Sequence, residues 1–269
     1  MLHAQHPLSV PEVDIVLIHG LRGGALLTWR TQLDGEEGDL VLWPRDWLGA
    51  EFTNSRILSL SYDTRLSGWT GPNRNLPEQA TRALKAFAQA QLGQNNTPIL
   101  FCTHSYGGLI SKQALVLAKS SDNPQWKHIL SNVRGLVFFG TPHHGSPLAN
   151  LVNHAFFQSV LKPSECVVEL FPGANQLEEL NYEFRRIVER LGIEDHIYCF
   201  GEGKSTAIGT WRGRRFSSYL VPPRSADVGF GHFQLISGVN HIQLCKPRNP
   251  NDSRFIRICH IVSNITKND

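Results

Sequence analysis

Residues 98–110 read Pro-Ile-Leu-Phe-Cys-Thr-His-Ser-Tyr-Gly-Gly-Leu-Ile, and this stretch decides the fold. An apolar run without charge leads to Ser105, and two glycines then open a second apolar segment. This order is typical of a nucleophile elbow, in which a serine sits on a sharp turn between a buried strand and a helix. The stretch therefore predicts a parallel α/β sheet and makes Ser105 a candidate nucleophile.

The elbow pattern G-x-S-x-G is matched at only one of its two glycine positions. Gly107 stands two residues after Ser105, where a small residue lets strand and helix approach each other, but Thr103 replaces the first glycine. A serine followed by two glycines also occurs in ordinary strand–turn–helix units. The motif alone leaves both interpretations open, so the other parts of a serine-hydrolase site must be sought elsewhere in the chain.

Strands and helices alternate on both sides of the elbow. Short apolar runs rich in β-branched residues predict buried strands, and apolar residues at helical spacing predict helices. The predicted strands are 13–20, 56–62, 98–104, 133–140, 196–202 and 233–237, and the predicted helices are 78–92, 106–119 and 253–265. Repeated βα units predict a single domain over residues 1–269, with a mostly parallel sheet covered by helices on both faces. Together with the elbow, this predicts the α/β-hydrolase fold.

The alternation pauses over residues 146–191, which we expect to form a small helical cap insertion. Its first part, 151–161, is apolar and contains Phe156 and Phe157. Its second part carries apolar residues at helical spacing, namely Leu177, Leu180, Phe184, Ile187 and Leu191. Such a stripe usually packs in a core, and a lid that meets a lipid is the other interpretation. We favour the core for the second part and leave both interpretations open for the first.

Composition argues against several other classes of protein. The formal net charge of +3, without a long basic run, gives no sign of nucleic-acid binding. The chain begins without the basic and apolar parts of a signal peptide and contains no run of 18 apolar residues. The five cysteines form no Cys-x-x-Cys pair, which argues against a disulfide framework and suits the cytosol: Cys102, Cys166, Cys199, Cys245 and Cys259. We expect a cytoplasmic chain, or the catalytic piece of a longer, anchored protein.

A catalytic serine of this type needs an acid and a histidine that follow it along the chain in that order. His241 follows the last predicted strand and is the candidate base. Glu202, at the end of the preceding strand, is the candidate acid, and Asp227, in the loop before the last strand, is the alternative. His104 adjoins the serine, but the alternation of side chains along a strand directs it to the opposite face, so we assign it a structural role.

Two backbone N–H groups are expected to bind the substrate oxygen. Leu21 follows the first buried strand and Tyr106 follows the nucleophile, which are the two donor positions of an α/β-hydrolase oxyanion hole. His143 and His144 are adjacent and have no carboxylate or cysteine at ligand spacing, so we expect a role in the loop rather than a metal site. We expect neither a metal nor an organic cofactor.

Further motifs give the chain a resemblance to a known family. They are Ile18-His19-Gly20-Leu21, residues 43–48, Tyr62-Asp63-Thr64, residues 104–109, residues 142–146, Ser225-Ala226-Asp227, Val239-Asn240-His241 and Cys245-Lys246-Pro247. Over nearly its whole length, the chain resembles the α/β-hydrolase domain of the serine-active-site-containing protein family, a lipase-like group linked to phosphatidylglycerol remodelling. The resemblance implies an ester or phospholipid substrate. It also supports Glu202, because relatives carry a Glu-Thr pair in that region, and it singles out Tyr106, where relatives often carry methionine.

The leading hypothesis is a serine hydrolase that cleaves carboxylic esters, of lipid or acyl type, through an acyl-enzyme on Ser105. One alternative is a noncatalytic α/β-hydrolase module that binds a partner or a lipid through the cap. Another is a lipid acyltransferase, which would pass the acyl group to an alcohol in a site that excludes water. We expect an ester or lipid as the partner molecule, with peripheral membrane contact through the cap.

Overall fold

The computed structural model describes residues 2–5, 10–21, 23–33, 40–62, 75–146, 175–211 and 214–267, with only the backbone described at 2–5, 208–211 and 214–216. Within these residues the main element is a seven-stranded sheet of order β1-β5-β2-β6-β7-β8-β11. Its strands are β1 (Leu2–Gln5), β2 (Val13–Ile18), β5 (Ser55–Leu60), β6 (Ile99–His104), β7 (Val133–Phe139), β8 (Ile197–Gly203) and β11 (His232–Ser237). Only β1 runs antiparallel to its neighbour among these strands, which confirms the predicted, mostly parallel sheet.

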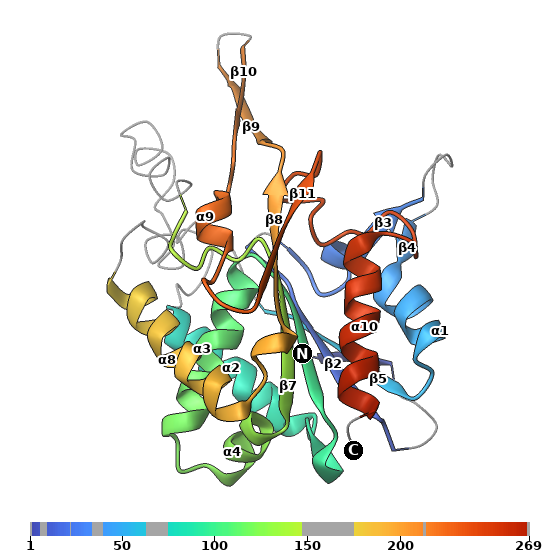
Figure 1. Ribbon diagram of the computed structural model, residues 1–269, viewed down its shortest axis with the longest axis vertical. Helices are drawn as coiled ribbons and strands as arrows, with labels where there is room; N and C mark the ends of the chain where they lie inside the picture. Colours follow the sequence, from blue (N-terminus) through green and yellow to red (C-terminus); the bar gives the residue numbers. More distant parts are fainter. Residues whose placement is uncertain are drawn as a thin grey trace.

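Helices cover both faces of the sheet (Figure 1). The first face carries α2 (Leu76–Gln89), α3 (Tyr106–Ser120), α4 (Pro124–Ser131) and α8 (Asn175–Leu191). The second face carries the π-helix η2 (Pro44–Leu48), α1 (Gly49–Glu51) and α10 (Ser253–Lys267). Each face has its own apolar core, and the second is built around the buried Trp29, Trp43 and Phe255.

Strand β6 supplies side chains to both cores in turn. Ile99 and Phe101 pack in the core under α2 and α3, whereas Leu100 and Cys102 pack in the core on the α10 side. Because side chains alternate along a strand, His104 continues the face of Leu100 and Cys102, as predicted. The strand ends at His104, and the chain turns at the next residue into α3.

Helix α8 confirms the core interpretation of the predicted stripe. Its buried residues include Leu177, Leu180, Phe184 and Ile187, and these join the core that α3 also lines. The helix therefore covers the sheet on the connection between β7 and β8 (Figure 1). Residues 147–174, with Phe156, Phe157 and Cys166, lie outside the described residues, so the extent of the cap stays a prediction.

In the described part of the chain, two small antiparallel pairs lie outside the main sheet, and neither was predicted. One joins β3 (Arg30–Gln32) to β4 (Leu40–Leu42). The other joins β9 (Thr206–Trp211) to β10 (Arg214–Ser218), and this hairpin extends beyond the carboxyl end of β8 (Figure 1). The other short helices of the described ranges are η1 (Leu27–Trp29), η4 (Gln94–Asn96), η5 (Glu194–His196) and α9 (Pro223–Ala226).

Candidate active site

Ser105 forms the turn between β6 and α3 in a strained backbone conformation. Its φ and ψ angles are 54° and −126°, a region that residues with a side chain rarely adopt. Its N–H donates to the Phe139 carbonyl oxygen at 2.9 Å, and its own carbonyl accepts from the Gly108 N–H at 3.0 Å. A sharp strand-to-helix turn centred on a serine is the geometry that the elbow motif predicts.

Two glycines allow the backbone to close around this turn. A Cβ atom on Gly107 would lie 2.4 Å from the Ile18 carbonyl oxygen and 2.5 Å from that of His19. A Cβ atom on Gly20 would lie 2.7 Å from the Cβ of Ser105. The loop that follows β2 is therefore packed directly against the elbow, which explains why both positions need glycine.

The two residues that depart from the usual elbow pattern, Thr103 and Tyr106, are both fully buried. Thr103 donates from Oγ1 to the Val137 carbonyl oxygen at 3.2 Å, so its hydroxyl is satisfied within the sheet. The Tyr106 side chain lies in the apolar core beneath α3. The fold thus accommodates both residues in its interior.

Glu202 and His241 meet beside this turn, at the ends of neighbouring strands. Glu202 belongs to β8, and His241 follows β11. The Glu202 Oε1 atom lies 3.5 Å from Nδ1 of His241, and the two residues are 0% and 6% exposed. Among the described residues Nδ1 has no hydrogen-bond partner, so Glu202 approaches it at ion-pair distance only, and such contacts often tighten when substrate binds. Of the described carboxylates, Glu202 is the one within 4 Å of a His241 nitrogen.

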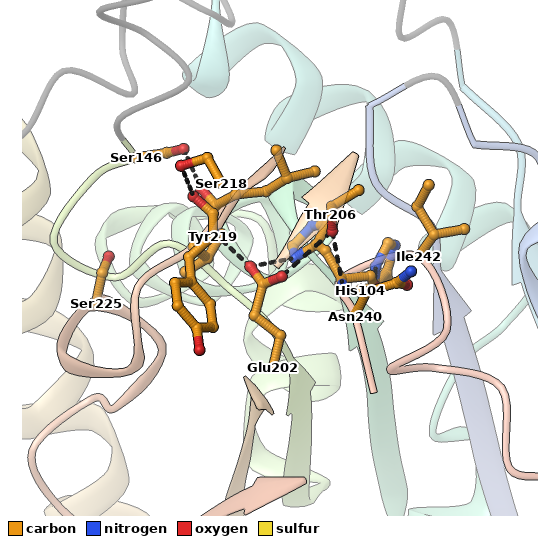
Figure 2. A network of polar contacts seen from close by, with 12 residues as sticks. His104, Ser146, Glu202, Thr206, Ser218, Tyr219, Ser225, Asn240 and Ile242 are labelled. Carbon is orange, nitrogen blue, oxygen red and sulfur yellow. Dashed lines mark hydrogen bonds and ion pairs between the residues drawn. The ribbon is translucent and has the colours of Figure 1, made fainter. Parts of the chain in front are cut away.

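Thr206 and Val221 orient the Glu202 carboxylate. Figure 2 shows Thr206 beside Glu202. The Val221 N–H donates to Oε1 at 2.7 Å, and the Thr206 hydroxyl donates to Oε2 at 3.4 Å. The same hydroxyl oxygen accepts from the His241 N–H at 3.3 Å. Thr206 therefore connects the candidate acid to the candidate base. The sequence did not predict the roles of Thr206 and Val221, because no catalytic motif includes either of them.

Asp227, the alternative acid, has a different role in the structure. It follows α9, and its Oδ1 atom accepts from the Gly229 N–H at 2.8 Å. The pKa of the Cys199 thiol is raised to about 12, mainly because the thiol is buried. The negative charge of Asp227 raises this pKa further. The geometry favours Glu202 over Asp227 as the partner of His241.

His104 lies on the predicted face of β6 and there contacts His241. The two ring centroids are 4.9 Å apart, and Nε2 of His104 lies 3.0 Å from the His241 carbonyl oxygen. Burial, followed by the neighbouring His241, lowers the pKa of His104 to about 3. His104 is therefore neutral near pH 7, and a proton on Nε2 lets it donate to that carbonyl. This contact, which the sequence did not predict, fixes the backbone of His241.

The two predicted oxyanion donors both adjoin Ser105. Tyr106 is the first residue of α3, where N–H groups point out of the helix and the helix dipole favours negative charge. Leu21 directly follows Gly20, the residue packed against the Ser105 side chain. The structure thus brings together the elbow, both predicted donor positions and the Glu202–His241 pair.

His143 is fully buried, whereas His144 is partly exposed and pairs with Glu178 at 2.9 Å. His143 Nδ1 lies 3.2 Å from Nζ of Lys112, and its Nε2 lies 3.8 Å from Sγ of Cys199. The His143 N–H donates to the Ser225 carbonyl oxygen at 2.8 Å. These contacts agree with the prediction that the two histidines stabilise the loop after β7.

Lys112, Asn181 and His143 form a buried set that we call the Lys112 network. Lys112 donates from Nζ to Asn181 Oδ1, and Asn181 donates from Nδ2 to the His143 carbonyl oxygen at 2.9 Å. Burial lowers the pKa of Lys112 to about 7. The network connects α3, α8 and the loop after β7.

The described residues contain no cluster of three or more side chains suited to hold a metal ion. In the same part of the chain, none of the helices has both the length and the apolar character needed to cross a bilayer.

No protein-family model matches the chain. Human SERAC1 is 31% identical to it over 264 residues, which cover 92% of this chain and 38% of the human protein. The chain is a homologue of SERAC1. Zebrafish SERAC1 is likewise 31% identical over 280 residues, 97% of this chain and 40% of that protein. The chain spans about two fifths of the length of these SERAC1 relatives.

Solved structures place this SERAC1 homologue in the α/β-hydrolase fold. The mature form of the Bacillus licheniformis lipase BlEst2 is similar, with a TM-score of 0.59 and 17% identity over 96% of this chain and 98% of the lipase. The phospholipase PlaB from Legionella pneumophila has a TM-score of 0.60 and 15% identity over 95% of this chain and 64% of PlaB. At such low identities the likeness confirms the predicted fold, and the fold alone does not fix the function.

Proposed function

We propose that this chain is a serine hydrolase that cleaves carboxylic esters, with Ser105 as its nucleophile. The observation that carries the proposal is the strained turn at Ser105 beside the buried Glu202–His241 pair. Strain of this kind persists only where the surroundings enforce it, and it concentrates at functional sites. Here the serine is held at the carboxyl end of a parallel sheet, where such folds bind their ligands.

In the proposed reaction, the Ser105 hydroxyl oxygen attacks the acyl carbon while Nε2 of His241 takes the hydroxyl proton. Glu202 faces Nδ1, so it holds the imidazole in the required tautomer and stabilises its protonated form. His241 then gives the proton to the leaving alcohol. Water attacks the acyl-enzyme in the same way and releases the acid.

The negative charge that forms on the acyl oxygen would be met by the N–H groups of Leu21 and Tyr106. Each such donor is worth about 3 kcal/mol of transition-state stabilisation in related sites. Because both belong to segments packed against Ser105, they require no rearrangement at the moment of reaction.

A lipid or acyl ester is the substrate class that we propose. Exposed apolar residues lie beside the site: Ile242, next to His241, is 56% exposed, and Leu27, the first residue of η1, is 63% exposed. The segments that carry them are in contact, because Lys246 donates from Nζ to the Leu27 carbonyl oxygen at 3.3 Å. An apolar surface of this kind suits an acyl chain better than a polar substrate.

Labelling with a fluorophosphonate probe, together with turnover of esters of increasing acyl length, tests the proposal. Ser105→Ala is expected to abolish labelling and to lower kcat by at least about 10³-fold while the fold is retained. Ser120→Ala, at the exposed end of α3, is the matched control and should keep both activities. Unchanged turnover in Ser105→Ala would overturn the proposal, and a folded wild type that takes no label would favour the noncatalytic module.

A further inference from the structure

Tyr62 lies beside the loop that carries one of the two proposed oxyanion donors. It follows β5, which pairs in parallel with β2, and Leu60 of β5 lies opposite Ile18 of β2. His19 directly follows β2, so Tyr62 and His19 leave the sheet side by side at the same edge. Tyr62 also opens the motif Tyr62-Asp63-Thr64, to which the proposed reaction gives no role.

Tyr62 holds His19 at two points. Its hydroxyl group donates to the His19 carbonyl oxygen at 2.5 Å. Its ring stacks on the imidazole of His19, with ring centroids 4.4 Å apart and an interplanar angle of 16°. His19 is buried, and burial lowers its pKa, so its ring is neutral near pH 7. Both the main chain and the side chain of His19 are therefore fixed by one tyrosine.

His19 in turn holds the peptide unit that joins Gly20 to Leu21. Its Nδ1 atom lies 2.9 Å from the Gly20 carbonyl oxygen, which can only accept, so Nδ1 carries the proton of the neutral ring. The Gly23 N–H donates to the same oxygen at 3.1 Å. In a planar trans peptide unit, the C=O of Gly20 and the N–H of Leu21 point in opposite directions. Two hydrogen bonds to the oxygen therefore set the direction of the Leu21 N–H.

We propose that Tyr62 is a positioning residue for the oxyanion hole, which acts through His19 to aim the N–H of Leu21 at the acyl oxygen. The inference rests on the proposed function. An oxyanion donor is effective because its direction is set before the reaction, and a donor that must reorient contributes less. In the sheet, β5 and β8 lie on opposite sides of β6. One side thus supports the oxyanion donor, and the other carries the acid.

The first test removes only the hydroxyl group. Tyr62→Phe keeps the ring, and with it the stack on His19 and the packing against the core under α2 and α3. We expect kcat for ester hydrolysis to fall at least about tenfold, with KM changed by less than about threefold, because the interaction acts in the transition state. Tyr182→Phe is the matched control, since it removes the same group from an exposed tyrosine of α8. It should change kcat by less than about twofold.

The second test uses an alkyl trifluoromethyl ketone as an analogue of the transition state. The Ser105 hydroxyl oxygen adds to its carbonyl carbon: a C–O bond forms, the carbonyl π bond breaks, the hydroxyl proton passes to His241, and the carbonyl oxygen becomes the oxyanion. In Tyr62→Phe, the Ki should rise by about the factor by which kcat/KM falls, because the adduct and the transition state use the same donors. Titration with a fluorophosphonate counts the active sites. A loss of folded protein would lower that count and leave the Ki unchanged.

Two results would overturn this inference while the proposed function stands. The first is turnover that depends on Ser105 but is as fast in Tyr62→Phe as in Tyr182→Phe. The second is a lower kcat in Tyr62→Phe without a change in the Ki of the ketone. Unchanged turnover in Ser105→Ala would instead remove the proposed function, and this inference with it.

Discussion

Glu202 and His241 are each held by more than one neighbour, and these neighbours differ in chemistry. The carboxylate accepts from a backbone N–H of Val221 and from the hydroxyl of Thr206. The backbone of His241 is fixed by Thr206 and by the neutral ring of His104. Among the described residues, the groups that orient the pair are therefore uncharged.

The choice between the two candidate acids gives a prediction at this scale. Glu202→Gln should lower kcat for ester hydrolysis by about 10⁴-fold, because an amide cannot stabilise the charged imidazole and favours the wrong tautomer. Asp227→Asn keeps the side-chain oxygen that accepts from Gly229 and should change kcat by less than about twofold. Steady-state kinetics on folded variants checks both. A larger loss in Asp227→Asn than in Glu202→Gln would contradict the assignment.

Part of this site could be predicted from the sequence, because chain order carries the information. Ser105, Glu202 and His241 stand in the order that an elbow fold requires, at positions that follow apolar strands. Thr206 and the contact of His104 with His241 could not be predicted in this way. They depend on which segments meet in space, and no spacing rule connects residue 104 to residue 241.

At the elbow, β2, β6 and α3 pack closely against one another. The backbone of α3 at Gly107 lies against carbonyl oxygens at the end of β2. Two strands and a helix therefore meet where side chains would keep them apart, and this brings the loop that holds Leu21 up to Ser105.

A prediction at the element scale follows from this contact. Gly107→Ala should lower the free energy of unfolding by more than about 3 kcal/mol or prevent folding, because the new Cβ atom meets backbone atoms that cannot rotate away. Gly24→Ala is the matched control: its Cβ would lie 3.8 Å from the nearest side chain, that of Leu27. We expect the control to change stability by less than about 1 kcal/mol. Urea unfolding measures both, and equal stability of the two variants would contradict the packing argument.

The elements that the sequence predicted are those with a strong apolar pattern. β2, β6 and β7 are nearly continuous apolar runs, and α8 carries an apolar stripe. The β9–β10 hairpin was missed because its residues 206–218 are mostly small, polar or basic and do not alternate. Hairpins of this composition are fixed by backbone pairing, which a hydrophobic pattern does not reveal.

At the scale of the whole molecule, the Lys112 network joins α3, α8 and the loop after β7 through buried polar contacts. Lys112 of α3 binds Asn181 of α8 and His143 of the loop after β7. All three residues are buried, and no carboxylate forms an ion pair with the lysine among the described residues. A charged form of Lys112 is therefore costly, and neutral partners bind its amine instead.

This burial predicts how stability depends on pH. The pKa of Lys112 falls from 10.5 to about 7 in the folded chain, so between these values the unfolded chain binds a proton that the folded chain does not. The free energy of unfolding should therefore rise with pH across this window, by up to about 1.4 kcal/mol per pH unit. Lys112→Met lacks this contribution, so the difference between the wild type and the variant should grow in favour of the wild type from pH 7 to pH 10.

Urea unfolding at several pH values measures this difference. Lys85→Met, which removes an exposed lysine of α2, is the control, and the pH dependence of the Lys112→Met difference must exceed that of the control. If the wild type does not gain stability relative to Lys112→Met as the pH rises, the burial of a neutral Lys112 amine is contradicted.

The positive φ of Ser105 bears on how this chain would respond to laboratory evolution. Glycine adopts that backbone conformation without strain, so replacing the serine would relieve about 1–3 kcal/mol. A population selected for heat tolerance alone would accumulate glycine at position 105 and lose its hydroxyl group. Every round of such a campaign therefore needs a screen for ester turnover, because at this position the more heat-resistant clone would lack the proposed nucleophile.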